Sequence, residues 1–283
     1  TSAWAGLHYF ASRGGQAEHN EKAHDGAVLT WPDGLNPLIR HMQGSYHPAQ
    51  NLRGFATRVT DNGLSVSVDV FDTQSKVATQ LIADHVICAM PLHVAAHVVE
   101  NIADLGFDAK LHGSHHAPWQ VSNFLIDRFP NEIDNQPLAW DNVVYGSGSL
   151  GFVNGTHQLI RAAKPEMSVL TAYHAYAGEN AKVVRQRLLS SSADELYQIA
   201  VRDLDATYGW GNPLKAMQHV KQVEITLRGH AMASPTVGFL SNQGVQNLIR
   251  QDSRIQFAHS DLSGLSIFEE AAWWGDVAAR RLL

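Results

Sequence analysis

Apolar spacing predicts a β-rich region between residues 55 and 90. Apolar and polar residues alternate from Leu64 to Val70, directly after the turn residues Asp61-Asn62-Gly63, and the segment FATRVT precedes that turn. Alternation on both sides of an Asn-Gly turn is typical of a β-hairpin. Nearly every residue from Val86 to Met90 is apolar, which predicts a strand covered on both faces. Pro91 ends it, and LHVAAHVVENIA continues with helical spacing.

The middle of the chain, from about residue 101 to 235, has a different pattern. Three strand-like segments, WQVSNFLIDRF, MSVLTAYHAY and HVKQVEITL, surround a helical block from Asn180 to about Tyr208. Within the block, Ser192 and Glu195 have the spacing of a capping box, so we expect a second helix to begin near Ala193. Upstream, the turn signal TWPDG precedes a short amphipathic helix around LIRHM.

The last 30 residues combine a strand, a polar turn and a helix. Apolar residues from Ile255 to Ala258 lead into a turn that carries Asp261. Ser266 and Glu269 form a second capping-box pattern, which predicts a helix beginning at Ile267. The positive end of this helix would favour negative charge, such as the charge that develops on a reduced flavin. An ordinary capped terminal helix explains the same residues.

These patterns predict an α+β or α/β protein of one large domain or two intertwined ones. The chain has 283 residues, of which 45% are hydrophobic and 17% charged, as in globular proteins. A net charge of -6 without a basic block argues against nucleic acid as a partner. No apolar run is long enough to span a membrane, so we expect a soluble protein. The single cysteine, Cys88, excludes an internal disulfide and is expected to be buried.

Sixteen histidines raise the question of a metal site. The densest group, HGSHH, contains His112, His115 and His116 and lies between Gly113 and Pro118. No second group of cysteines, histidines and carboxylates follows at ligand spacing. We therefore expect a surface loop and no metal.

The segment GSGSLG, Gly146 to Gly151, has the spacing of a dinucleotide-binding loop. Such a loop must lead directly into a helix, whose N-terminal amides hold the pyrophosphate. Here it is followed by FVNGTHQ, and no acidic residue stands about 20 positions on to bind the ribose. A turn between two strands is the better interpretation.

The C-terminal segment resembles the flavin motif of FAD-dependent amine oxidoreductases, the flavin amine oxidase superfamily. Ser260-Asp261 stands where that family has a Gly-Glu-type pair, and Phe268-Glu269-Glu270-Ala271 stands at the start of the helix that points at the flavin. Ser260, Asp261 and Glu270 depart from the family pattern. The segment VICAMP resembles the family's VI-x-A-x-P strand, and Val59 stands where the family contacts adenine through backbone atoms.

The resemblance extends over nearly the whole chain. The segments APWQVSN, AWDNVVYGSGSLGFVNGTHQ, SVLTAYHAY and RGHAMASPTVGFL look most similar to bacterial spermidine-dehydrogenase-like members. The family's N-terminal Gly-rich unit for the ADP moiety is missing, and the chain starts at TSAWAGLHYF without an initiating Met. We therefore expect a fragment or processed subunit that another segment or chain completes. A bacterial periplasmic or cytoplasmic location is implied, with no signal to choose between them.

The resemblance implies a two-domain FAD-linked fold. Residues 1–100 would hold flavin-domain segments and part of the substrate side, 101–235 the substrate domain, and 236–283 the C-terminal flavin-binding segment. The cofactor would be FAD, which accepts a hydride from the amine carbon at N5 and leaves an imine for water to hydrolyse. The expected FAD contacts are Val59, Ala89, Pro91, Ser260, Asp261, Ser266, Ile267 and Phe268.

An aromatic wall would suit an amine or polyamine. The candidates are Trp119, Trp140 and Tyr173, with Asp134, Asp141 and Glu179 as acidic residues at the pocket mouth and His230 near the reacting centre. Two alternatives remain. The chain could be a non-catalytic remnant or partner subunit of a flavin oxidoreductase, or an NAD-dependent enzyme that uses Gly146 to Gly151.

Overall fold

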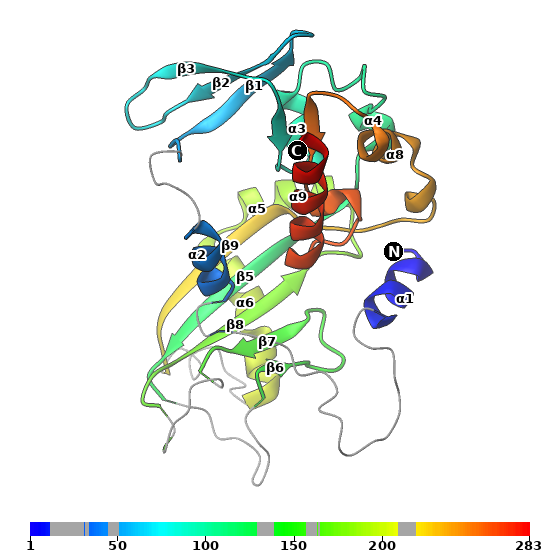
Figure 1. The fold of residues 1–283 in the computed structure, drawn as a ribbon. Helices are drawn as coiled ribbons and strands as arrows, with labels where there is room; N and C mark the ends of the chain where they lie inside the picture. The colour runs from blue at the N-terminus through cyan, green and yellow to red at the C-terminus, as the bar shows by residue number, and fades with distance from the viewer. Residues whose placement is uncertain are drawn as a thin grey trace. The chain divides into compact units, whose positions relative to one another are not determined.

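The computed structural model describes residues 1–11, 31, 34–44, 51–128, 139–156, 163, 165–208 and 219–283. The chain divides into two compact units (Figure 1). The first unit comprises residues 1–21, 46–115 and 232–283, and the second comprises residues 22–45 and 116–231. Both units contain helices and strands, so the predicted mixed class is confirmed.

The first unit contains a three-stranded sheet, a parallel strand pair and several helices. The antiparallel sheet is β1 (Phe55–Asp61), β2 (Val66–Phe71) and β3 (Ala78–Ala83), and the pair is β4 (Val86–Cys88) with β10 (Ile255–Phe257). The helices are α1 (Ala3–Ala11), α3 (Leu92–Val98), α4 (Ala109–His112), η2 (Phe239–Ser241), α8 (Gln243–Arg250), η3 (Ser260–Leu262) and α9 (Phe268–Leu282). The predicted hairpin is confirmed as β1 and β2.

The parallel pair lies in the core of this unit. Ile255 and Phe257 of β10 pack with Cys88 of β4 and Leu92 of α3 in one apolar cluster. The predicted strand after Val86 is confirmed, but the prediction that both its faces are covered is wrong, because Ile87 is 38% exposed. Cys88 is buried as predicted, and burial raises the pKa of its thiol to about 12.

In its described residues, the second unit contains a five-stranded sheet and three helices. The strands are β5 (His116–Ile126), β6 (Asp141–Asn142), β7 (Gly151–Asn154), β8 (Ser168–Ala175) and β9 (Val220–Ala233), in the order β6-β7-β8-β5-β9. The helices are α2 (Asn36–Gln43), α5 (Ala181–Ser190) and α6 (Ala193–Tyr208). All three predicted strands, the predicted pair of helices and the short helix around LIRHM are confirmed. Gly34 donates its N–H to the Trp31 carbonyl, while Thr30, Pro32 and Asp33 of the predicted turn lie outside the described residues.

Alternation along β5 separates the two faces of this sheet. Residues Gln120, Ser122, Phe124 and Ile126 are buried, whereas Trp119, Val121, Asn123 and Leu125 between them are half-buried. Phe124 packs with Leu170 of β8 and with Ala200 and Leu204 of α6, so α6 covers the buried face. We call the opposite side of the sheet the outer face; it carries Trp119, Val121 and Asn123 of β5 with Thr171 and Tyr173 of β8.

One predicted capping box is confirmed and the other is wrong. Ser192 and Glu195 exchange hydrogen bonds at the start of α6, from Ser192 N to Glu195 Oε2 and from Glu195 N to Ser192 Oγ. At α9, Ile267 is the N-cap and no side chain caps the helix. The Ser266 hydroxyl instead accepts a hydrogen bond from the backbone N–H of Ala233, 2.8 Å away.

Two loop predictions have different outcomes. GSGSLG is a turn between the antiparallel strands β6 and β7, as predicted. The expected surface loop at HGSHH holds for Gly113 to His115, but His112 ends α4, and His116 is 6% exposed and begins β5. Within the described part of the chain, none of the helices has the length and apolar character that crossing a bilayer requires.

Candidate functional site

In the first unit, the predicted cofactor residues gather where two parallel strands end. β4 runs through Ala89 to Pro91 and α3, and β10 runs into η3, which carries Ser260 and Asp261. Carboxyl ends of parallel strands meet at one edge of a sheet, which is where ligands bind in α/β proteins. Strand pairing therefore brings these four predicted residues to one edge, although their two segments are far apart in the sequence.

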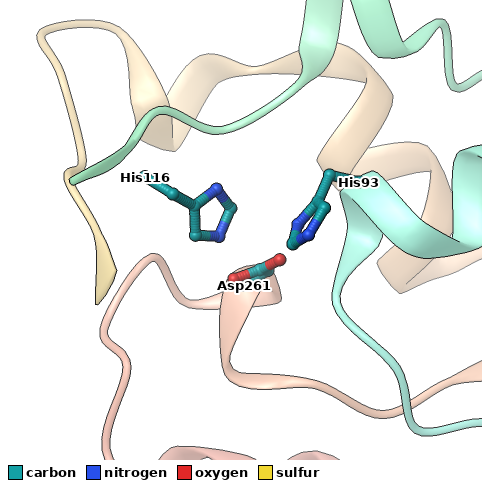
Figure 2. A group of neighbouring side chains, drawn as sticks. All are labelled: His93, His116 and Asp261. Atoms are coloured by element: carbon teal, nitrogen blue, oxygen red, sulfur yellow. The ribbon is translucent and has the colours of Figure 1, made fainter. Parts of the chain in front are cut away.

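Asp261 is the centre of this edge. Its side chain is fully buried, and its Oδ2 accepts a hydrogen bond from the backbone N–H of Leu92, 2.9 Å away, in the first turn of α3. His259 Nδ1 accepts the N–H of Asp261 at 3.0 Å. Figure 2 shows the Asp261 carboxylate turned toward the imidazole of His93, which follows Leu92 in α3; His116, drawn in the same view, belongs to the second unit. The carboxylate thus fixes the η3 turn to the start of α3.

The start of α9 offers backbone amides that no side chain caps. A hydrogen-bond network on its flank holds the helix instead: Ser263 Oγ donates to Glu270 Oε2 at 2.5 Å and accepts from Trp274 Nε1 at 2.6 Å. The N-cap residue, Ile267, is 41% exposed. Helix N-termini have unsatisfied N–H groups and a positive dipole end. This end therefore fits an acceptor group with partial negative charge, such as the pyrimidine edge of a flavin.

The network explains one departure from the flavin motif. Glu270 is one of the residues that depart from the motif, and its carboxylate accepts the Ser263 hydroxyl. His8 of α1 also lies 3.5 Å from Glu270. The sequence alone did not predict these contacts. Ser263 lies before the helix, and only the bend of the chain between Ser263 and α9 brings it to Glu270 and Trp274.

The remaining predicted cofactor residues differ in their surroundings. Phe268, the first residue of α9, is half-buried. Pro91 is half-buried, and its carbonyl accepts the N–H of Ala95, whereas Ala89 is exposed. Val59 in β1 is 1% exposed and its carbonyl accepts the N–H of Glu100, 3.0 Å away. It therefore lies beyond the C-terminal end of α3, away from the Asp261 edge.

In the second unit, the outer face of the sheet brings two predicted substrate residues together. Trp119 and Tyr173 lie on adjacent strands with ring centroids 6.3 Å apart and an interplanar angle of 60°. Asp141 of β6 pairs with Val153, which pairs with Thr171, so the alternation places Asp141 on this same face. Two aromatic rings and a carboxylate are groups that attract an organic cation.

The charge of Asp141 affects the pKa of Tyr173. Burial raises the pKa of the Tyr173 phenol above its ordinary value of 10.0, and the Asp141 carboxylate raises it further. Tyr173 is therefore a neutral hydrogen-bonding group over the whole physiological range of pH.

The other predicted substrate residues lie elsewhere. Trp140 makes no ring contact with Trp119 or Tyr173; its carbonyl accepts the N–H of Asn154 beside β6. Glu179 forms a surface ion pair with Arg187, with N–O distances of 2.7 and 2.9 Å. His230 is an exposed residue of β9 whose ring lies 6.1 Å from that of His116. Desolvation lowers the pKa of His230, and the charges of Arg185 and His116 lower it further. Asp134 lies outside the described residues.

Comparison with known proteins identifies the family. The family model for flavin containing amine oxidoreductases matches residues 13–283. The chain belongs to this family. Its cofactor is accordingly FAD, and the predicted superfamily is confirmed. Under the NAD-dependent alternative GSGSLG would begin a helix, whereas it leads into strand β7.

One solved structure supports the fold. A reduced UDP-galactopyranose mutase is similar with a TM-score of 0.55 at 9% sequence identity, over 84% of this chain and 49% of that chain. A Pyrococcus furiosus protein, PF1083, has a TM-score of 0.41 at 11% identity, over 81% of this chain and 46% of that one. The chain thus spans about half the length of either structure. No curated protein matches it.

Proposed function

We propose that this chain is the flavin-contacting and substrate-binding portion of an FAD-dependent enzyme that oxidises amines. FAD, when bound, supplies the redox chemistry by accepting a hydride from the carbon that bears the amine, and water then hydrolyses the imine product. The observation that carries the proposal is the uncapped start of α9 in the first unit, together with family membership.

In this proposal the chain's own residues bind and orient. The amides of the first turn of α9, beginning at Phe268, would hold the pyrimidine edge of the flavin, whereas the Ile267 N–H already donates to the Leu265 carbonyl at 2.8 Å. Asp261 would keep the η3 turn in place beside the flavin. Backbone amides that are fixed before binding stabilise negative charge without having to reorganise. Ala89, Pro91, Ser260 and Ser266 would complete the protein contacts around the ring and ribityl chain.

We further propose that the outer face of the sheet binds the amine. Trp119 and Tyr173 would form an aromatic wall, and Asp141 would attract a second, protonated nitrogen. A substrate with two or more amino groups, such as a polyamine of the spermidine type, uses both features. A segment or chain that carries a Gly-rich ADP-binding unit would complete the FAD site. Trp140 is a weaker candidate, because its ring makes no contact with the rings of Trp119 and Tyr173. His230 is also weaker, because it is an exposed residue of β9.

Anaerobic mixing of the complete flavin-loaded protein with amines tests this function. We expect a diamine or polyamine to bleach the visible flavin absorption faster than a monoamine of similar length. Asp141→Asn should reduce that preference by up to about fivefold, because Asp141 is exposed and a charge interaction at an exposed site contributes up to about 1 kcal/mol. Glu179→Gln, which removes a carboxylate paired with Arg187, is the matched control and should leave the preference unchanged.

Three results would reject the proposal. A purified complete protein without flavin absorption would support a non-catalytic remnant. A flavin that no amine reduces would exclude amine oxidation while leaving the family assignment intact. Equal effects of Asp141→Asn and Glu179→Gln would remove the role of the outer face.

A further inference from the structure

The GSGSLG segment, which is not a nucleotide loop, is attached to a buried carboxylate of the second unit. Ser147 Oγ donates a short hydrogen bond to Asp203 Oδ1 of α6. Asp203 is 3% exposed, and its second oxygen, Oδ2, has no hydrogen-bond partner within the part of the chain that the structure describes. This hydrogen bond therefore attaches the loop from Val143 to Leu150 to a carboxylate in the interior of the unit.

The hydrogen bonds within the loop run in one direction. The Gly151 N–H points to Ser149 Oγ at 3.4 Å, and the Ser149 N–H donates to Ser147 Oγ at 2.9 Å. The two serine hydroxyls lie 3.1 Å apart. Because Ser147 uses its single hydroxyl proton on Asp203, Ser149 must be the donor between them. The bonds through Gly151, Ser149 and Ser147 then lead toward Asp203, and hydrogen bonds aligned in this way strengthen one another.

The two ends of this loop frame Tyr173. Gly151 is the register partner of Tyr173, and the Leu150 N–H donates to the Tyr173 carbonyl at 3.0 Å. The other end of the loop continues from β6, which carries Asp141, and the charge of Asp141 acts on the Tyr173 phenol. The loop is bonded to the backbone of Tyr173 and is continuous with the strand that carries Asp141. A shift of the loop would therefore change the distance between these two side chains.

Stability alone gives little reason for this arrangement. Burial of a carboxylate with one oxygen unpaired costs free energy, and replacement of buried charged groups by apolar ones is often neutral or stabilising. The best-attested role of buried polar groups of this kind is to favour one local conformation over others. The arrangement selected here is that of the loop beside Tyr173.

We infer that Asp203 is a positioning residue for amine binding: through Ser147 it fixes the loop from Val143 to Leu150 and thereby the spacing of Tyr173 and Asp141 on the outer face. The inference rests on the proposed function, because it assigns Asp203 to the same amine site. Asp203 itself lies on the opposite, helix-covered side of the sheet and does not touch the substrate.

The test compares Ser147→Ala and Asp203→Asn with Ser168→Ala in the complete flavin-loaded protein. Ser168 is a matched control because it is a buried serine of the same unit that bonds Thr156 and Asn154 away from the loop. We expect Ser147→Ala and Asp203→Asn each to raise KM for a diamine about three- to tenfold, with kcat changed less than about twofold. Their effects on KM should not add in the double variant, since both act on one hydrogen-bond chain: Ser147→Ala removes its donor to Asp203, and Asp203→Asn weakens the same bond by removing the charge of its acceptor.

Hydrogen exchange provides a readout that is independent of turnover. The amides of Ser149 and Gly151 should exchange faster in Ser147→Ala and Asp203→Asn than in the wild type, and at the wild-type rate in Ser168→Ala. Asp203→Asn keeps the size of the side chain and one acceptor oxygen, so it also provides a variant that folds if Ser147→Ala does not.

The outcomes separate the two proposals. Wild-type amine turnover, with KM and loop exchange in both variants matching Ser168→Ala, would overturn the inference and leave the proposed function standing. Faster loop exchange without a change in KM would also overturn it, because the loop would then be irrelevant to the amine. A wild-type protein that oxidises no amine would overturn the proposed function, and the inference with it.

Discussion

Asp261 joins two segments that lie 169 residues apart in the chain, through its hydrogen bond to the Leu92 N–H. A buried carboxylate that accepts a backbone N–H at the first turn of a helix satisfies a donor that the helix itself cannot. Asp261 therefore has a structural role in the first unit in addition to its proposed place beside the cofactor.

Replacement of Asp261 should separate these two contributions. Asp261→Ala leaves the Leu92 N–H buried without its acceptor and should lower the free energy of unfolding by about 1–3 kcal/mol. Asp261→Asn keeps an oxygen that can accept this bond and should cost less. Urea denaturation of the flavin-free protein measures both values.

The control for Asp261 is Asp276→Ala, which removes a surface carboxylate paired with Arg280 one turn later in α9. Surface ion pairs of this type contribute little. If Asp261→Ala proved no more destabilising than Asp276→Ala, the bond to Leu92 would not hold the edge together.

The turn between β6 and β7 depends on one glycine. Gly151 has a φ of 93°, and a Cβ at this position would lie 1.9 Å from the Asn142 carbonyl oxygen. Gly151→Ala should therefore destabilise the protein by more than about 2 kcal/mol, through both backbone strain and a clash with the facing strand. Gly178→Ala is the matched control, since nothing lies within 4 Å of its Cβ position. Thermal unfolding of the two variants should differ by several degrees, and equal melting temperatures would mean that the turn does not require glycine.

Local patterns in the sequence predicted most helices and strands, and non-local contacts explain the failures. The capping box at Ser192 formed because both partners lie within four residues. The Ser266 hydroxyl instead accepts a hydrogen bond from the N–H of Ala233, which is 33 residues away in the sequence. Strand β3 was not predicted, because five of its six residues are exposed and no alternation marks a buried face.

In the candidate sites, too, the contacts that the sequence did not predict are non-local. Residue type singled out Trp119 and Tyr173, whereas Asp261 was singled out by its place after the strand from Ile255 to Ala258 and by the resemblance to the flavin motif. The register of β5 with β8 decides that Trp119 and Tyr173 meet, and no local pattern encodes that register. The partners of Asp261 and Ser263 also come from other segments, so the sequence could name these residues but not the groups that they bind.

In the whole protein, FAD binding should slow hydrogen exchange of the backbone amides at the start of α9 more than at the start of α5. If the amides at the start of α9 receive the flavin, their hydrogen exchange should slow when FAD is added to the complete flavin-free protein. With ligand at 100 times Kd, binding stabilises the folded state by about 2.7 kcal/mol. The first turn of α5 is the internal control, because Asn180 Oδ1 already accepts the N–H groups of Lys182 and Val183. Equal slowing at both helices would mean general stabilisation rather than contact at α9.

The pairing of β4 with β10 also has a consequence for synthesis on the ribosome. β4 leaves the ribosome long before its only partner strand among the described residues, and at 5–20 residues per second the delay is on the order of ten to thirty seconds. Most of the second unit is translated within that interval. The apolar side of β4 and α3 therefore stays uncovered in the nascent chain until β10 is made, and exposed apolar surface of this kind is what chaperones bind.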